Sequence, residues 1–141
     1  MSYFTSTFDL ILESKDKKYT KESVQKEIER IESQREPLKI FKGLWNLVVH
    51  LLQFVIITPA AIITLSSVMI IAVTALIGSA LTINGKKDKL IELRSIVLKQ
   101  DIKANVMSNI SKDARESKAY ASYHKELQEC MKILDEAIAK M

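Results

Sequence analysis

The 141-residue chain contains one cysteine, two prolines and three glycines. A single cysteine excludes an internal disulfide framework and is typical of a reducing compartment. So few glycines and prolines exclude a β-sandwich or barrel, which needs a turn signal about every 8–12 residues. The length is that of one ordinary domain, which excludes an enzyme with a separate cofactor domain. We therefore expect an all-α fold.

The chain also lacks the residue patterns of catalysis and of metal binding. Neither His50 nor His124 has a second metal-ligating side chain three or four residues away. The three glycines are too far apart for a phosphate-binding loop, and there is no nucleophile elbow. The sequence thus predicts no catalytic residue, no metal site, no cofactor and no small-molecule substrate.

The positive net charge does not indicate nucleic-acid binding. Of the formal charge of +4, residues 1–43 carry +1 and residues 84–141 carry +3, so neither segment forms a concentrated basic patch. All charged residues lie in these two segments. We expect no nucleic-acid partner.

Residues 44–83 contain no Asp, Glu, Lys or Arg, and 28 of these 40 residues are apolar. Such a run is a transmembrane signal. One helix of this length would measure about 60 Å, twice the hydrocarbon thickness of about 30 Å. Two spans with a turn near 59–67 fit better, because Pro59 and the Ser66-Ser67 pair interrupt the run there. The sequence predicts a transmembrane helical hairpin over 44–83.

The flanks of the run support two crossings with both termini in the cytoplasm, since basic residues precede and follow it. Interfacial anchors are expected at five positions: Lys39, Lys42, Trp45, Lys86 and Lys87. Small residues that allow two membrane helices to approach closely are Ala72, Ala75 and Ser79. The prediction is a multi-pass membrane protein with two spans, in contact with the lipid bilayer.

Three alternatives remain at this stage. In the first, the run forms the central hairpin of a soluble helical bundle; in the second, only residues 62–83 cross the membrane, after an interfacial helix. The third alternative is a hairpin that enters a single leaflet.

Both flanking arms are expected to be helical and to resemble coiled coils. In the N-terminal arm, residues 1–43, apolar side chains recur at helical spacing and predict an interaction seam of Val24, Ile28, Ile31 and Leu38. The C-terminal arm, residues 84–141, is expected to hold helices over 86–110 and 112–141. The second carries a regular seam of Tyr120, Tyr123, Leu127, Cys130 and Leu134. The partner of each seam is the other arm, a second copy or another protein.

No motif identifies a family, but the layout resembles in topology two groups of proteins: the inclusion-membrane effectors of intracellular bacteria and small phage- or plasmid-encoded exclusion proteins. This resemblance implies a non-enzymatic scaffold or adaptor that is inserted in a membrane and binds proteins through its helical arms. A membrane-permeabilising hairpin is the alternative function, and a soluble bundle that binds proteins is the third.

Overall fold

The computed structural model describes residues 21–57, 67–83 and 86–141, and these residues form helices and no strand. The predicted all-α class is confirmed. The predicted turn near 59–67 lies outside the described residues, apart from Ser67. The helices are α2 (Lys21–Glu32), α3 (Pro37–Ile57), α5 (Val68–Thr82), α6 (Lys87–Ile110) and α7 (Ala114–Lys140).

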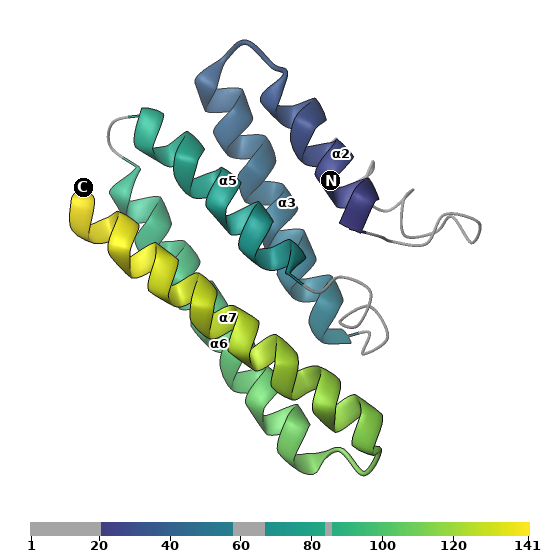
Figure 1. Cartoon of the computed structure of the whole chain (residues 1–141). Helices are drawn as coiled ribbons and strands as arrows, with labels where there is room; N and C mark the ends of the chain where they lie inside the picture. The colour runs from purple at the N-terminus through teal and green to yellow at the C-terminus, as the bar shows by residue number, and fades with distance from the viewer. Residues whose placement is uncertain (1–20, 58–66, 84–85) are drawn as a thin grey trace.

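The helices form a bundle in which α6 and α7 make a long antiparallel hairpin (Figure 1). Helix α7 packs chiefly on α6 and also on α5, while α3 lies against α5 and reaches α6. Helix α2 covers α3 and α5 on the side away from the hairpin. The end of the hairpin where α6 passes into α7 extends beyond α5 (Figure 1).

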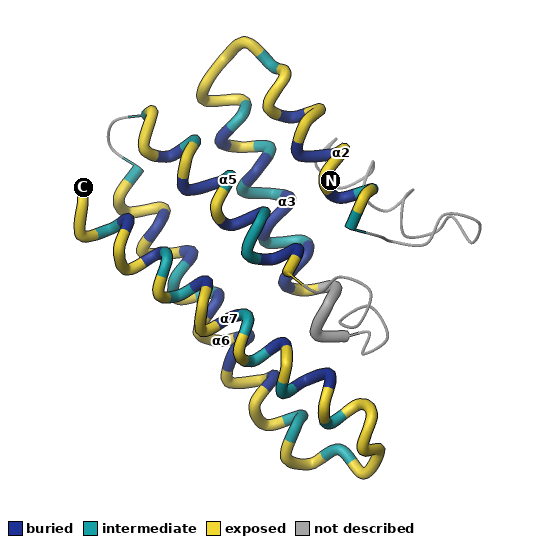
Figure 2. The backbone as a smooth tube through the Cα atoms, in the orientation of Figure 1, coloured by how far each residue is buried: buried dark blue, intermediate teal, exposed yellow. Residues whose placement is uncertain are grey.

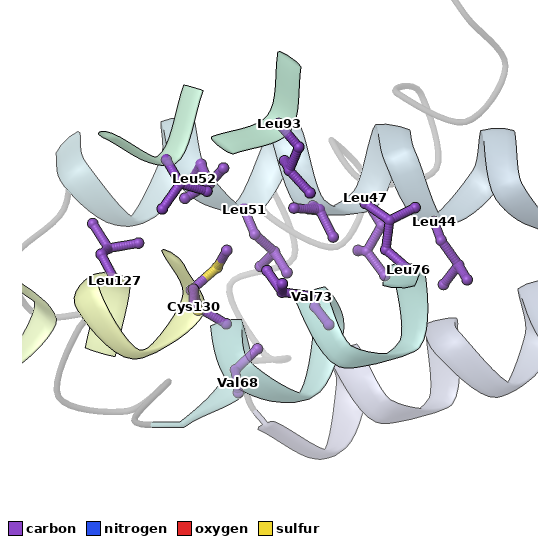
Figure 3. Close-up of a cluster of buried hydrophobic side chains, with 14 of the residues drawn as sticks. Leu44, Leu47, Leu51, Leu52, Val68, Val73, Leu76, Leu93, Leu127 and Cys130 are labelled. Carbon is purple, nitrogen blue, oxygen red and sulfur yellow. The ribbon is translucent and has the colours of Figure 1, made fainter. Parts of the chain in front are cut away.

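All five helices contribute to a single core of buried apolar side chains. Figure 2 shows buried and exposed positions alternating along each helix, as expected for amphipathic helices. At the centre, residues of α3, α5, α6 and α7 meet around Leu51, Val73, Leu93 and Cys130 (Figure 3).

Local sequence signals explain where several helices begin. Pro37 opens α3, a position where its missing N–H leaves no hydrogen bond unmade. Asp113 is the N-cap of α7, and its Oδ1 accepts hydrogen bonds from the backbone N–H groups of Arg115 and Glu116 at 2.8 and 3.4 Å. Helix α5 starts after Ser67, whose φ of 70° lies in the left-handed region.

The predicted two-span membrane protein is wrong. Within 21–57, 67–83 and 86–141, no helix combines the length and the apolar character that a membrane crossing requires. Helix α5 has 15 residues, or about 22 Å, against a hydrocarbon core of about 30 Å. Helix α3 carries Lys39 and Lys42 near its start. The alternative single crossing at 62–83 lies partly outside the described residues.

The prediction failed because the core of a helical bundle excludes charged side chains, as the interior of a membrane does. Either environment therefore gives an uncharged run in the sequence. The uncharged run supplies most of α3 and all of α5, and these two helices pack on each other and on the α6–α7 hairpin. Both helices therefore present apolar residues to protein on several sides.

Candidate interaction surface

The seam predicted at the C-terminus lies inside the chain. Tyr120, Tyr123, Leu127, Cys130 and Leu134 of α7 are all at most 2% exposed. They face α6 and α5, the helices on which α7 packs. Near the start of α6 and the end of α7, Arg94 Nε of α6 also donates to Asp135 Oδ1 of α7 at 2.5 Å. The partner of this seam is thus α6 and α5 of the same chain, and no surface is left on it for a second protein.

The N-terminal seam is internal as well, except at its last position. Val24, Ile28 and Ile31 are buried against the core, whereas Leu38 is exposed at the start of α3. Helices α2 and α3 approach closely at Gly43 of α3, where an added Cβ atom would lie 2.8 Å from Ile31 Cγ2 of α2. The glycine therefore permits α2 to pack tightly on α3.

The three small residues predicted to pack in a hairpin have different surroundings. Ala72 is fully buried, whereas Ala75 and Ser79 are half-buried. Ala75 and Ser79 line a shallow groove of about 520 Å³ between α5 and the start of α3, together with Ile40 and Leu44. Ala72 thus belongs to the core, whereas Ala75 and Ser79 lie beside the groove.

The residues predicted to anchor a membrane interface lie at one end of the bundle, where α3 and α6 begin. Phe41 and Trp45 stack with their ring centroids 6.3 Å apart. Lys86 lies over the Phe41 ring at 5.3 Å and Lys89 over the Trp45 ring at 5.0 Å. These cation–π contacts link α3 to α6. The other three predicted anchors, Lys39, Lys42 and Lys87, are exposed.

Polar side chains interrupt the interface between α6 and α7 next to its apolar seam. Asp101 of α6 is buried and pairs with His124 Nδ1 of α7. Within the described part of the chain, Gln100 Oε1 and the Tyr123 hydroxyl are buried without a hydrogen-bond partner. Burial raises the pKa of Tyr123 above its usual range, so the phenol stays neutral. Of these groups, Asp101 and His124 make a direct polar contact between α6 and α7.

Two further groups of α7 are held inside the bundle. Glu126 Oε1 accepts a hydrogen bond of 3.0 Å from the backbone N–H of Met69, in the first turn of α5. Burial raises the pKa of the Glu126 carboxyl, although its hydrogen bonds to that backbone act in the opposite direction. Burial also raises the pKa of the Cys130 thiol to about 12, which makes it unreactive at neutral pH.

Among the described residues, the large exposed apolar side chains gather mainly on α6, on the side opposite its buried residues. Of the eight large hydrophobic residues that are exposed in the described ranges, five belong to this helix. We call them the α6 stripe: Ile91 (48% exposed), Leu98 (39%), Ile102 (56%), Val106 (48%) and Ile110 (65%). Ile102 and Val106, with Lys103 and Met107, line a hollow of about 350 Å³.

Sequence reasoning did not separate this stripe from the core side of the helix. Leu90, Leu93 and Val97 point into the bundle, and Ile102, Val106 and Ile110 point away from it. The signal was present in the spacing, because the stripe recurs at steps of seven, four, four and four. Two apolar sides on one helix blur the 3.6-residue period, so the pattern alone did not show which side is covered.

Among the described residues, no group of three or more His, Cys, Asp or Glu side chains could hold a metal ion. No protein-family model, characterised protein or solved structure is significantly similar to this chain. The surface features of the bundle are therefore the basis for a functional proposal.

Proposed function

We propose that this chain is a non-enzymatic helical protein that acts by binding another protein chain, and that the α6 stripe is its contact surface. The observation that carries the proposal is the exposure of five large aliphatic side chains along one side of α6, four of which follow one another at steps of four from Leu98 to Ile110. Single exposed hydrophobic residues are ordinary on protein surfaces, but a contiguous apolar patch marks an interaction site.

The burial of the two predicted seams supports α6, instead of either seam, as the contact surface. Both seams are covered by other helices of the same chain, apart from Leu38. The α6 stripe has the dimensions of a helix-docking surface: it runs from Ile91 to Ile110, a distance of about 29 Å along the helix. Helical partners commonly bind through such a line of aliphatic anchors.

The test compares two double variants of the full chain. In the first, Ile102→Asp with Val106→Asp introduces charge into the middle of the stripe. In the control, Ser122→Asp with Gln128→Asp introduces the same charge at exposed positions of α7. Since all four positions are exposed at least in part, circular dichroism melts should show that both variants fold.

Each variant and the native chain are then purified under native conditions from the cells that produce the protein, and bound chains are quantified by mass spectrometry. We expect a stoichiometric protein partner, either a second copy or a different chain, with the native protein and the control. The stripe variant should lose it. Retention of the partner by the stripe variant, or no bound chain on the native protein, would contradict the proposal.

A further inference from the structure

We infer that the occupant of the α6 stripe is a second copy of this chain, with the two α6 helices packed antiparallel about a twofold axis near residues 100–101. This inference rests on the proposed function and names its partner. It follows from the area of the stripe, the direction of the helix dipoles and the position of the hollow within the stripe.

The area fits a stable dimer. Five aliphatic side chains that are 39–65% exposed leave roughly 400 Å² of apolar surface in water. Two copies together would bury about 800 Å² of apolar surface. Since apolar atoms make up about 60% of a protein interface, the total interface would be roughly 1,300 Å², within the range of specific complexes.

The helix dipoles favour the antiparallel direction. A parallel pair would align the two α6 dipoles side by side, whereas an antiparallel pair opposes them. The charges do not distinguish the two directions, because the exposed Lys99 and Lys103 lie close to the axis and beside the lysines of the other copy in either case.

The antiparallel pairing also makes the stripe complementary to itself, as a twofold interface requires. With the axis near 100–101, Ile91 of one copy lies beside Ile110 of the other. Leu98 then lies opposite the hollow formed by Ile102, Lys103, Val106 and Met107, which is large enough to receive a leucine side chain. The same contact occurs twice, once for each copy.

The buried side of α6 is compatible with this arrangement. Leu90, Leu93 and Val97 remain against the core of their own chain, so that dimerisation requires no opening of the bundle. In the second half of the stripe, Ile102, Val106 and Ile110 are 48–65% exposed and therefore accessible to another molecule. Each protomer would dock as a preformed unit.

The first experiment measures mass by sedimentation equilibrium of the full chain over a range of concentrations. We expect a monomer–dimer equilibrium that the Ile102→Asp variant weakens at least about tenfold, whereas the Gln128→Asp control leaves it unchanged. A monomer at all concentrations would overturn the inference. So would a dimer that Ile102→Asp does not weaken, because it would use another face.

The second experiment determines direction by disulfide trapping. Single variants Ile91→Cys and Ile110→Cys are oxidised separately and as a mixture; the native Cys130 is fully buried and serves as an internal negative control. In the antiparallel pair, position 91 lies about 29 Å from its own copy but next to position 110. We expect cross-linked dimer from the mixture alone. Cross-linking within each single variant would overturn the antiparallel arrangement.

The two proposals fail in different ways. If the chain is monomeric but loses a different protein when the stripe carries Ile102→Asp and Val106→Asp, the inference of a second copy is wrong and the proposed function stands. If the stripe variant changes neither self-association nor any other bound chain, both are wrong.

Discussion

Helices α6 and α7 are partners in one hairpin, yet they use their apolar residues differently. Helix α7 collects its large apolar side chains on one side, where Tyr120, Tyr123, Leu127 and Leu134 are buried. Helix α6 divides them between two sides: Leu90, Leu93 and Val97 are buried, and Ile102, Val106 and Ile110 are exposed. Within a single chain, other helices cover the apolar seam of α7, whereas the second apolar side of α6 stays exposed to solvent.

This difference teaches that a regular seam and a binding surface are separate properties. A one-sided seam is what a helix needs to pack inside its own bundle. A second apolar side is unnecessary for that packing and carries a cost in solubility, so it requires another explanation. On these grounds the α6 stripe, rather than the more regular α7 seam, is the candidate for contact with another chain.

The largest effect on the free energy of unfolding is expected where α7 packs into the core. Leu127 is fully buried, at one end of the cluster shown in Figure 3. We expect Leu127→Ala to lower the free energy of unfolding by about 2–5 kcal/mol, because it removes buried methyl groups and leaves a cavity. Urea denaturation followed by circular dichroism measures this change. The exposed Ser122→Ala on the same helix is the control, and a loss below about 1 kcal/mol at Leu127 would contradict the packing described above.

An intermediate effect is expected at Glu126, where α7 contacts α5 instead of α6. Replacement by Ala removes the acceptor for the Met69 N–H and should cost about 0.5–2 kcal/mol, the value of a helix cap. Replacement by Gln keeps an acceptor oxygen and removes the charge. Comparison of the two variants by thermal melts separates the hydrogen bond from the carboxylate.

The same carboxyl group predicts a pH dependence. Its pKa is raised in the folded chain by burial, so the folded state binds a proton at a higher pH than the unfolded state does. The contribution to stability is therefore fully present below the unfolded pKa of about 4.5 and decreases as pH rises through the folded pKa. We expect Glu126→Gln to remove this part of the pH profile. An identical profile in native and variant proteins would show that Glu126 is not responsible.

The all-α class and the beginning of α7 could be read from the sequence. Scarce glycine and proline excluded most β folds, and the break predicted between helices over 86–110 and 112–141 falls where α7 begins, with Asp113 as its N-cap. These features depend on neighbouring residues only. The contact between Glu126 and Met69 depends on residues 57 positions apart and has no local pattern.

The surroundings of the uncharged run and of the α6 stripe do not follow from the sequence, because they also depend on residues far apart in the chain. Composition reports how apolar a segment is, but it does not report what covers it. The run over 44–83 was assigned to lipid, whereas other helices cover much of α3 and α5. On α6, Ile102 and Leu93 are equally apolar in sequence, and only the positions of the helices that pack on α6 distinguish the exposed residue from the buried one.

The smallest effect on folding is expected on the α6 stripe, and it completes the comparison with α7. Ile102→Ser should change the free energy of unfolding by no more than about 0.5 kcal/mol when measured at concentrations where the chain is monomeric, since the isoleucine is already 56% exposed. At high concentration the native chain should gain stability from association and the variant should gain less. Denaturation curves at several protein concentrations measure both quantities. A large loss in the dilute monomer would mean that Ile102 packs within its own chain, as Leu127 does, and the distinction between the two helices would fail.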